Sequence, residues 1–365
     1  MSVDARKRKV TEIMNSLILN AKNKNFYLDP IFEDDINNLF STSVWGFREI
    51  VLVSGIATLL DSNFKASTNL YQCKPRAVFE ECIRPILAEE GIPHRKSGPL
   101  NIAKAAQGLN AEWAAQRRPK KVALSVVKLV ELMEGYAQKE IENLMTFLLH
   151  QLLIEAVKVE SLVLDLEPKE DPELLFNILV RLINETPDRG NTPQRIIGYL
   201  LDVYHKSLNT GIIVSGHEDS ASTTNTTSKK PGDIQEVDKK GEIINIYEVT
   251  IKTFGQQRID DSYASVVEYE KSSEKTIKDI TVICKEENCP AEIDKSSTSG
   301  YLGKVKIENV EYFFIDIYEW IMLKLILMPP NVRLALHSTI DDYVSDYNTA
   351  EKVKILWKEL NDGLS

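Results

Sequence analysis

The sequence is poor in cysteine and lacks a long uninterrupted apolar run. Its 365 residues include four cysteines, none in a Cys-x-x-Cys pair and none with a nearby histidine that would complete a zinc site. These features argue against a disulfide scaffold or a zinc-dependent fold and predict reduced thiols in a cytosolic protein. The most apolar windows, 147–166 and 320–330, either contain charged side chains or are too short to cross a bilayer. We therefore expect core helices there and no contact with a membrane.

Two further classes of motif are absent. Neither G-x-G-x-x-G nor a P-loop occurs, so no bound nucleotide is implied. The five histidines show neither the spacing of a catalytic triad nor that of a metal site. The first 23 residues combine basic side chains with a short apolar stretch interrupted by Glu12 and Asn15, which is typical of an amphipathic helix rather than of a targeting segment.

The overall composition is that of an ordinary globular protein. Apolar residues make up 43% of the chain and charged residues 27%, and the length suggests about two domains. Such a chain can bury a full-sized core, which argues against an intrinsically disordered or collagen-like protein. The formal net charge of −10 argues against a polycation that coats nucleic acid, but it is compatible with a local basic groove.

The first part of the chain, about residues 1–190, has the pattern of helices. Val122, Val126 and Leu129 recur at helical spacing, and the run from 120 to about 166 continues without a proline. Two prolines then follow it. We therefore expect a helix-rich N-terminal region.

The second part, residues 191–365, alternates between helix and strand patterns. It opens with an expected helix over 193–208, for which Thr192 would be the N-cap. A segment of small polar residues, 215–231, is expected to be a loop. The remaining expected elements are strands at 243–252, 277–284 and 310–318, helices at 260–271 and 318–328, and one or two amphipathic helices over 333–360. The chain as a whole is therefore expected to be of the α/β (α+β) class.

A hairpin that follows the polar segment carries a group of ionisable residues. Asp233 stands at the start of a short strand, and a turn follows at 239–241. The returning strand carries Glu248, Thr250 and Lys252. Side chains alternate along a strand, so these three share one face, and an antiparallel pairing brings Asp233 close to it. We therefore expect two carboxylates and one ammonium group to converge at one end of a sheet.

Such a group of residues suits the hydrolysis of phosphodiesters. Mg²⁺ prefers carboxylate oxygens and keeps several of its waters. It polarises the scissile phosphate and lowers the pKa of a bound water. Asp233 and Glu248 are therefore the candidate Mg²⁺ ligands, and Lys252 is the candidate residue that orients or deprotonates the attacking water.

The stretch from Pro231 to Lys252 resembles the PD-(D/E)xK nuclease family. The Pro-Gly-Asp sequence has one glycine more than the family pattern, and Thr250 holds the place of the usual acid, two residues before the lysine. Glu248 lies four residues before Lys252, on the same expected strand face. The pieces GDIQ and YEVTIK, with LDVYH on the preceding helix, are more specifically similar to the SacI-type restriction endonucleases, in which the acid and the lysine are also four residues apart.

This resemblance implies a type II restriction endonuclease. It implies a nuclease core over 191–365, with a central mixed β-sheet flanked by helices, and a helical region over 1–190 for DNA recognition and dimerisation. It also implies cleavage of double-stranded DNA that leaves 5′-phosphates, a cognate DNA methyltransferase in the same system, and a cytoplasmic location in a prokaryote. A palindromic target requires two active sites related by a two-fold axis, so we expect a homodimer. Asp202, within LDVYH, is either a further acidic ligand or a carboxylate on the helix surface.

A basic segment lies within the expected helical region. Residues 64–121 contain eleven Lys or Arg and five Glu or Asp, a surplus of six positive charges on an acidic protein. This surplus is typical of a surface that follows phosphates. Arginine can read guanine and asparagine can read adenine in the major groove. The residues that we expect to contact DNA are Lys74, Arg76, Arg95, Lys96 and Asn101, and the alternative is that they are solvated loop charges.

The sequence is compatible with three functions. The first is the Mg²⁺-dependent, sequence-specific nuclease described above. The second is a repair, structure-specific or modification-dependent nuclease with the same catalytic core. The third is a helical DNA-binding or scaffolding protein without catalysis, which would leave the pattern of Asp233, Glu248 and Lys252 unexplained.

Overall fold

The chain divides into two compact units, Met1–Ser161 and Leu162–Ser365. The computed structural model describes residues 3–27, 30–95, 98–104, 106–164, 166–219, 221, 230–273 and 275–362. The boundary lies before helix α11 (Pro172–Glu185), and not at residue 190 as the sequence suggested, because α11 packs against helices of the second unit. Each unit has apolar clusters of its own.

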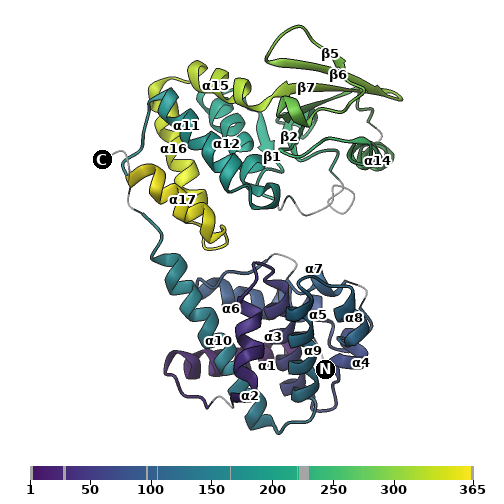
Figure 1. Ribbon diagram of the computed structural model, residues 1–365, viewed down its shortest axis with the longest axis vertical. Helices are drawn as coiled ribbons and strands as arrows, with labels where there is room; N and C mark the ends of the chain where they lie inside the picture. The colour runs from purple at the N-terminus through teal and green to yellow at the C-terminus, as the bar shows by residue number, and fades with distance from the viewer. Residues whose placement is uncertain are drawn as a thin grey trace. The chain divides into compact units, whose positions relative to one another are not determined.

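The described part of the first unit is built from helices (Figure 1). They are α1 (Val3–Lys22), α2 (Pro30–Phe40), α3 (Gly46–Leu60), α4 (Ala66–Asn69), α5 (Pro75–Val78), α6 (Arg84–Glu89), α7 (Leu100–Ala103), α8 (Ala111–Ala115), α9 (Lys120–Met133) and α10 (Gln138–Glu160). A 3₁₀ turn, Leu70–Cys73, precedes α5, and a π turn, Phe79–Ile83, follows it. Helix α3 forms the centre, since Phe47, Ile50 and Val53 are fully buried and α1, α9 and α10 pack around it.

The helical run expected over 120–166 is interrupted in the structure. Helix α9 ends at Met133, Gly135 lies in the connection, and α10 begins at Gln138. The carboxylate of Glu140 accepts a hydrogen bond from the backbone N–H of Ala137 at 2.8 Å, which satisfies one of the free donors at the start of α10. The apolar periodicity continues across the break because both helices bury one face in the same core.

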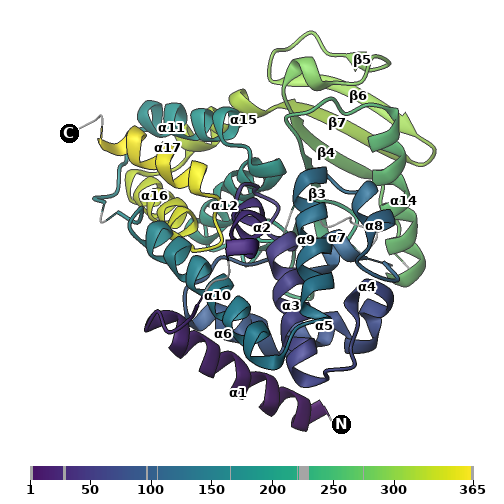
Figure 2. The same cartoon turned by 60° about the horizontal axis from the view of Figure 1, so that its bottom comes forward.

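The second unit contains a mixed seven-stranded sheet with the strand order β1-β2-β3-β4-β7-β6-β5. The strands are β1 (Ile213–Ser215), β2 (Ile234–Val237), β3 (Ile243–Val249), β4 (Asp279–Cys284), β5 (Asp294–Lys295), β6 (Tyr301–Ile307) and β7 (Val310–Asp316). Strands β3, β4 and β7 are parallel neighbours, and the other pairings are antiparallel. Figure 2 shows β3, β4, β7 and β6 in succession across the sheet. The expected central mixed sheet is therefore confirmed.

Helices cover both faces of this sheet, as expected. They are α11, α12 (Asn191–Ser207), α14 (Gln256–Ser273), α15 (Ile317–Leu327), α16 (Pro330–Ser345) and α17 (Glu351–Asp362). Val249 and Ile283 point into the cluster formed with α11, α12 and α15 to α17. Ile246 and Val282 point to the opposite face, where they pack with Ile259 of α14. The alternation of strand side chains thus separates two apolar layers.

Several predicted boundaries differ from the structure. Strand β3 ends at Val249 instead of 252, and β1, β5 and β6 were not predicted. The N-cap of α12 is Gly190, with a φ of 104°, whereas Thr192 lies in the first helical turn and its hydroxyl donates to the carbonyl of Thr186 at 2.6 Å. Of the polar segment 215–231, Ser220 and residues 222–229 lie outside the described residues. None of the described helices is both long enough and apolar enough to cross a bilayer.

Candidate functional site

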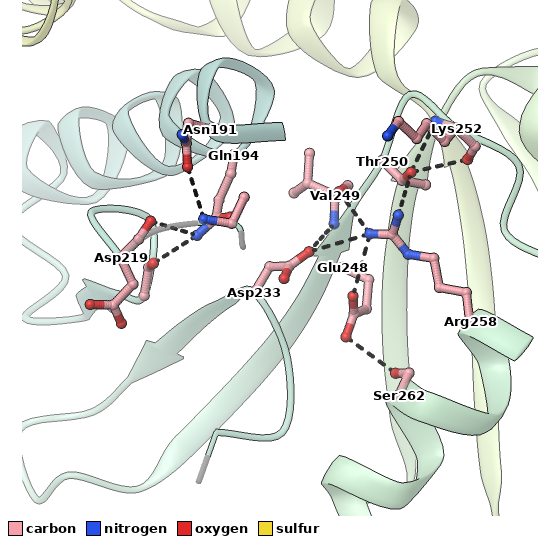
Figure 3. A network of polar contacts seen from close by, with 12 residues as sticks. Asn191, Gln194, Asp219, Asp233, Glu248, Val249, Thr250, Lys252, Arg258 and Ser262 are labelled. Carbon is pink, nitrogen blue, oxygen red and sulfur yellow. Dashed lines mark hydrogen bonds and ion pairs between the residues drawn. The ribbon is translucent and has the colours of Figure 1, made fainter. Parts of the chain in front are cut away.

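Asp233 and Glu248 face each other across the hairpin formed by β2 and β3. The register pairs Ile234 with Tyr247, and one step further along this antiparallel register Asp233 stands opposite Glu248. The side chains of both residues therefore lie on the same face of the sheet. The predicted approach of the two acids is found in the structure (Figure 3).

The glycine that departs from the usual motif has a structural reason. A Cβ atom on Gly232 would lie 2.5 Å from Cγ2 of Ile246 and 3.1 Å from the carbonyl oxygen of Tyr247. A side chain at position 232 would therefore push the start of β2 away from β3 and separate Asp233 from Glu248. Glycine permits this close approach of the two backbones.

Hydrogen bonds hold each carboxylate in position. Oδ2 of Asp233 accepts from the backbone N–H of Val249 at 3.0 Å. Oε1 of Glu248 accepts from the hydroxyl of Ser262 on α14 at 3.2 Å, and the hydroxyl of Tyr312 on β7 donates to that of Ser262 at 3.5 Å. Glu248 is only 3% exposed, so its position is set by these partners and not by solvent.

Burial and mutual repulsion make the two acids unusually hard to ionise together. Burial raises the pKa of Asp233, against the opposing effects of the Val249 N–H and of Arg258. Burial, followed by the negative charge of Asp233, raises the pKa of Glu248 well above its ordinary value. Two carboxylates that share a buried site need a positive charge between them to be fully ionised.

The described cation nearest to both carboxylates is Arg258, which the sequence analysis did not single out. Its Nη2 lies 3.8 Å from Oδ2 of Asp233 and 4.0 Å from Oε2 of Glu248. Nη1 donates to the hydroxyl of Thr250 at 2.8 Å, and Nη2 donates to the carbonyl of Val249 at 3.3 Å (Figure 3). The guanidinium is thus anchored beside the end of β3 and faces the pair of acids.

The placement predicted for Lys252, on the strand face shared with Glu248 and Thr250, is wrong. Strand β3 ends at Val249, and residues 251 and 252 lie in a bend beyond it. The hydroxyl of Thr250 accepts from the backbone N–H of Lys252 and donates to its carbonyl, both at 3.0 Å. This local side-chain bonding offers the backbone an alternative to strand pairing. Lys252 is consequently exposed and lies beyond the end of the strand.

Arg258 and Ser262 carried a signal that the sequence analysis missed. They are four residues apart, so in a helix they lie on one face. The predicted helix began at 260, which left Arg258 in a loop, whereas α14 begins at Gln256. With the correct start, one helical face would have offered a cation and a hydroxyl to the strand that carries Glu248.

Asp202 has a different environment. Its Oδ2 lies 2.6 Å from Nζ of Lys206, one turn further along α12. Lys206 is exposed and Asp202 is partly buried, and a pair at this spacing is typical of a helix surface. Asp202 is therefore a carboxylate outside the acidic pair, suited to comparison with Asp233 and Glu248.

The residues predicted to contact DNA lie in the first unit. Lys74 and Arg76 are exposed at the start of α5, where Arg76 pairs with Glu80 at 3.0 Å. The guanidinium of Arg95 lies 4.6 Å from the ring centroid of Trp45. Lys96 lies outside the described residues, and Asn101 is described only in its backbone, within α7. Lys74 and Arg76 are thus available to solvent, whereas Arg95 is partly covered.

The acidic pair fits the ligand chemistry of Mg²⁺. Mg²⁺ is commonly held by one or two carboxylates and keeps several waters. Asp233 and Glu248 supply two such groups, and burial, together with the charge of Asp233 beside Glu248, raises the pKa of both despite the nearby Arg258. Among the described residues no group of three or more His, Cys, Asp or Glu side chains is placed to hold a metal ion. A metal at this site would therefore depend on the two acids and on water or substrate oxygens.

No protein-family model matches the chain, and no curated protein matches its sequence. The function must therefore be inferred from the site itself.

Proposed function

We propose that the protein is a Mg²⁺-dependent endodeoxyribonuclease of the PD-(D/E)xK type, acting as a type II restriction endonuclease. The observation that carries this proposal is the pair formed by Asp233 and Glu248, opposite each other across β2 and β3 and faced by a cation. This arrangement offers two oxygen ligands and a positive charge at one point, as hydrolysis of a phosphodiester requires.

Asp233 and Glu248 would hold the metal. When bound, Mg²⁺ supplies positive charge to the scissile phosphate and lowers the pKa of a bound water. Ser262 orients Glu248, and the backbone N–H of Val249 orients Asp233. These hydrogen bonds preorganise the two carboxylates before substrate binds.

Two cations are available for the substrate. Arg258 faces the acids and presents a planar fork of N–H donors that matches the oxygens of a phosphate. Lys252, in the bend after β3, keeps the proposed role of orienting or deprotonating the attacking water. Hydrolysis would leave a 5′-phosphate and a 3′-hydroxyl.

The biological setting is part of the same proposal. Double-stranded DNA would be the substrate, with Lys74, Arg76, Arg95, Lys96 and Asn101 of the first unit as contacts. A homodimer would cut both strands of a palindromic site, because two-fold protein symmetry matches that of the DNA. A cognate methyltransferase and a cytoplasmic, prokaryotic location belong to this proposal.

A plasmid assay with matched variants tests the proposal. We expect discrete fragments with Mg²⁺, and their loss with EDTA and in Asp233→Asn and Glu248→Gln. Asp202→Asn should cut normally, because that carboxylate pairs with Lys206 on α12. A smear, or cutting of modified or branched DNA only, would favour a repair or modification-dependent nuclease. Failure to cut any DNA with several divalent ions would favour a non-catalytic binding protein.

A further inference from the structure

Two cysteines meet at the end of β4. Cys284 is the last residue of this strand, and Cys289 follows the 3₁₀ turn Glu286–Asn288. Their sulfur atoms are 3.9 Å apart, and either can donate a hydrogen bond to the other. Cys284 is fully buried, whereas Cys289 is partly exposed and lines a cavity of about 340 Å³.

We propose that Cys284 and Cys289 form a modification site, at which peroxide converts the two thiols reversibly into a disulfide. A disulfide has an S–S distance of 2.03–2.05 Å, so the sulfurs must approach by about 2 Å. The 3₁₀ turn between the two cysteines already brings their thiols into contact. One thiol faces a cavity and the other is buried behind it, which is the arrangement of an attacking and a resolving cysteine.

The chemistry balances with peroxide as the oxidant. The thiolate sulfur of Cys289 attacks one peroxide oxygen, the O–O bond breaks, and the departing hydroxide takes a proton to become water. This step leaves a sulfenic acid on Cys289. The sulfur of Cys284 then attacks the sulfur of Cys289, the S–O bond breaks, and hydroxide leaves with the thiol proton of Cys284 as a second water. Two thiols and one peroxide thus give one disulfide and two waters.

The environment of the pair favours Cys289 as the first to react. With Cys284 as donor, the hydrogen bond between the thiols lowers the pKa of Cys289. The same hydrogen bond, together with burial, raises the pKa of Cys284. The thiolate is the reactive form, and Cys289 is the thiol that the cavity exposes.

The other two cysteines provide an internal comparison. The thiol of Cys73 donates to the carbonyl of Leu70 at 3.2 Å, and that of Cys82 lies 3.9 Å from the carbonyl of Ala77. Burial raises the pKa of Cys73 to about 12 and also raises that of Cys82. Both should stay reduced under conditions that oxidise Cys289.

Backbone hydrogen bonds connect the thiol pair to the acidic site. The N–H of Thr250 donates to the carbonyl of Ile283 at 3.0 Å, and the N–H of Phe254 donates to that of Asn288 at 2.8 Å. These acceptors are the residues next to Cys284 and Cys289. The segment they hold leads from β3 to Arg258, so drawing the two sulfurs together should displace Arg258. This consequence for cleavage rests on the proposed function, whereas disulfide formation does not.

Peptide mapping of the full chain tests the modification site. The protein is treated with hydrogen peroxide and then unfolded in guanidinium, so that N-ethylmaleimide alkylates every remaining thiol, and the chain is digested with trypsin. Lys285 separates the two cysteines, so a disulfide joins peptides 279–285 and 286–295. We expect this joined species, reversible with dithiothreitol, while Cys73 and Cys82 are alkylated. Alkylation of Cys284 and Cys289 after peroxide treatment, or oxidation of Cys289 without pairing, would overturn the proposal.

The plasmid assay tests the connection to the site. Oxidised wild type should cut at least about tenfold more slowly than reduced protein, because a displacement of about 1 Å at a catalytic group costs on the order of 100-fold. Cys289→Ser should cut equally well before and after peroxide. A disulfide with unchanged cutting would overturn the connection to Arg258 alone. Absence of cutting in the reduced protein would instead contradict the proposed function.

Discussion

Arg258 donates a hydrogen bond from Nη1 to the hydroxyl of Thr250 at 2.8 Å. Counted from Glu248, position 250 is where the lysine of a (D/E)xK pattern would stand, and here it carries a hydroxyl. The helix that follows β3 thus supplies a cation to this position from outside the strand. Arg258 faces both acids, and the short side chain of Thr250 leaves room for it.

Substitution of the two cations should separate their roles. We expect Arg258→Ala to lower the rate of plasmid cleavage by at least about 100-fold, because it removes the charge nearest to the carboxylates. Lys252→Ala should cost less, about tenfold, since Lys252 is exposed beyond the strand. Single-turnover rates on plasmid DNA measure both. An unaltered rate in Arg258→Ala with complete loss in Lys252→Ala would assign the cationic role to the lysine alone.

Magnesium should stabilise the folded protein through the acidic pair. A ligand that binds only the folded state at about 100 times its dissociation constant adds roughly 2.7 kcal/mol. We therefore expect Mg²⁺ to raise the melting temperature of wild type and of Asp202→Asn, but not that of Asp233→Asn. Differential scanning calorimetry with and without MgCl₂ measures this without DNA. An equal rise in all three proteins would show that Mg²⁺ binds elsewhere.

Without metal, Asp233→Asn should unfold at a higher urea concentration than wild type. The asparagine oxygen can still accept from the N–H of Val249, while the repulsion with Glu248 is removed. Replacing a functional residue in this way typically increases the stability of the folded protein, since functional sites hold unfavourable charge. Urea titration at neutral pH is the measurement, and a lower midpoint in the variant would contradict this account of the pair.

Glu49 should make the stability of the protein depend on pH. It is 4% exposed, its Oε1 accepts from the backbone N–H of Arg95 at 2.8 Å, and burial raises its pKa to about 7. The folded state therefore holds this proton more tightly than the unfolded state, so its contribution to stability falls as the pH rises from about 4.5 to 7.

Glu49→Gln tests this dependence, because glutamine can accept the same hydrogen bond but does not titrate. We expect the variant to gain stability relative to wild type by roughly 2–3 kcal/mol between pH 5 and pH 8. Guanidinium unfolding curves at the two pH values measure the difference. A difference that does not change with pH would mean that Glu49 is ionised in the folded protein at pH 5.

The first unit should fold without the second. Its apolar cluster consists of residues between Val10 and Ala156, so the core needs no contribution from beyond Ser161. We expect a 1–161 fragment to unfold cooperatively on heating, as followed by circular dichroism at 222 nm. A 1–137 fragment, which lacks α10, should not, because it loses Leu144, Leu148 and Leu152 from that core.

Local sequence patterns were sufficient to predict an element where the alternation or helical spacing of its own residues is clear. The alternation in 243–252 identified β3, although the strand ends at Val249, and the apolar recurrence that begins at 120 identified α9. The break at Gly135 was missed because the apolar pattern reports which face is buried, and two helices on one core continue the same pattern. Strands β5 and β6 were missed because their pairing partners, and not their own composition, make them strands.

The amino-acid sequence by itself determined the class of the fold, the approximate elements of the second unit and the meeting of Asp233 with Glu248, since hairpin register follows from strand alternation and a short turn. Only the tertiary structure decided which cation faces those acids and which thiols touch. Arg258 reaches the acids because α14 packs on the sheet face that carries Glu248, and Cys284 meets Cys289 because the chain folds back after β4. Contacts of this kind depend on how separate elements pack, and no periodicity within one element encodes them.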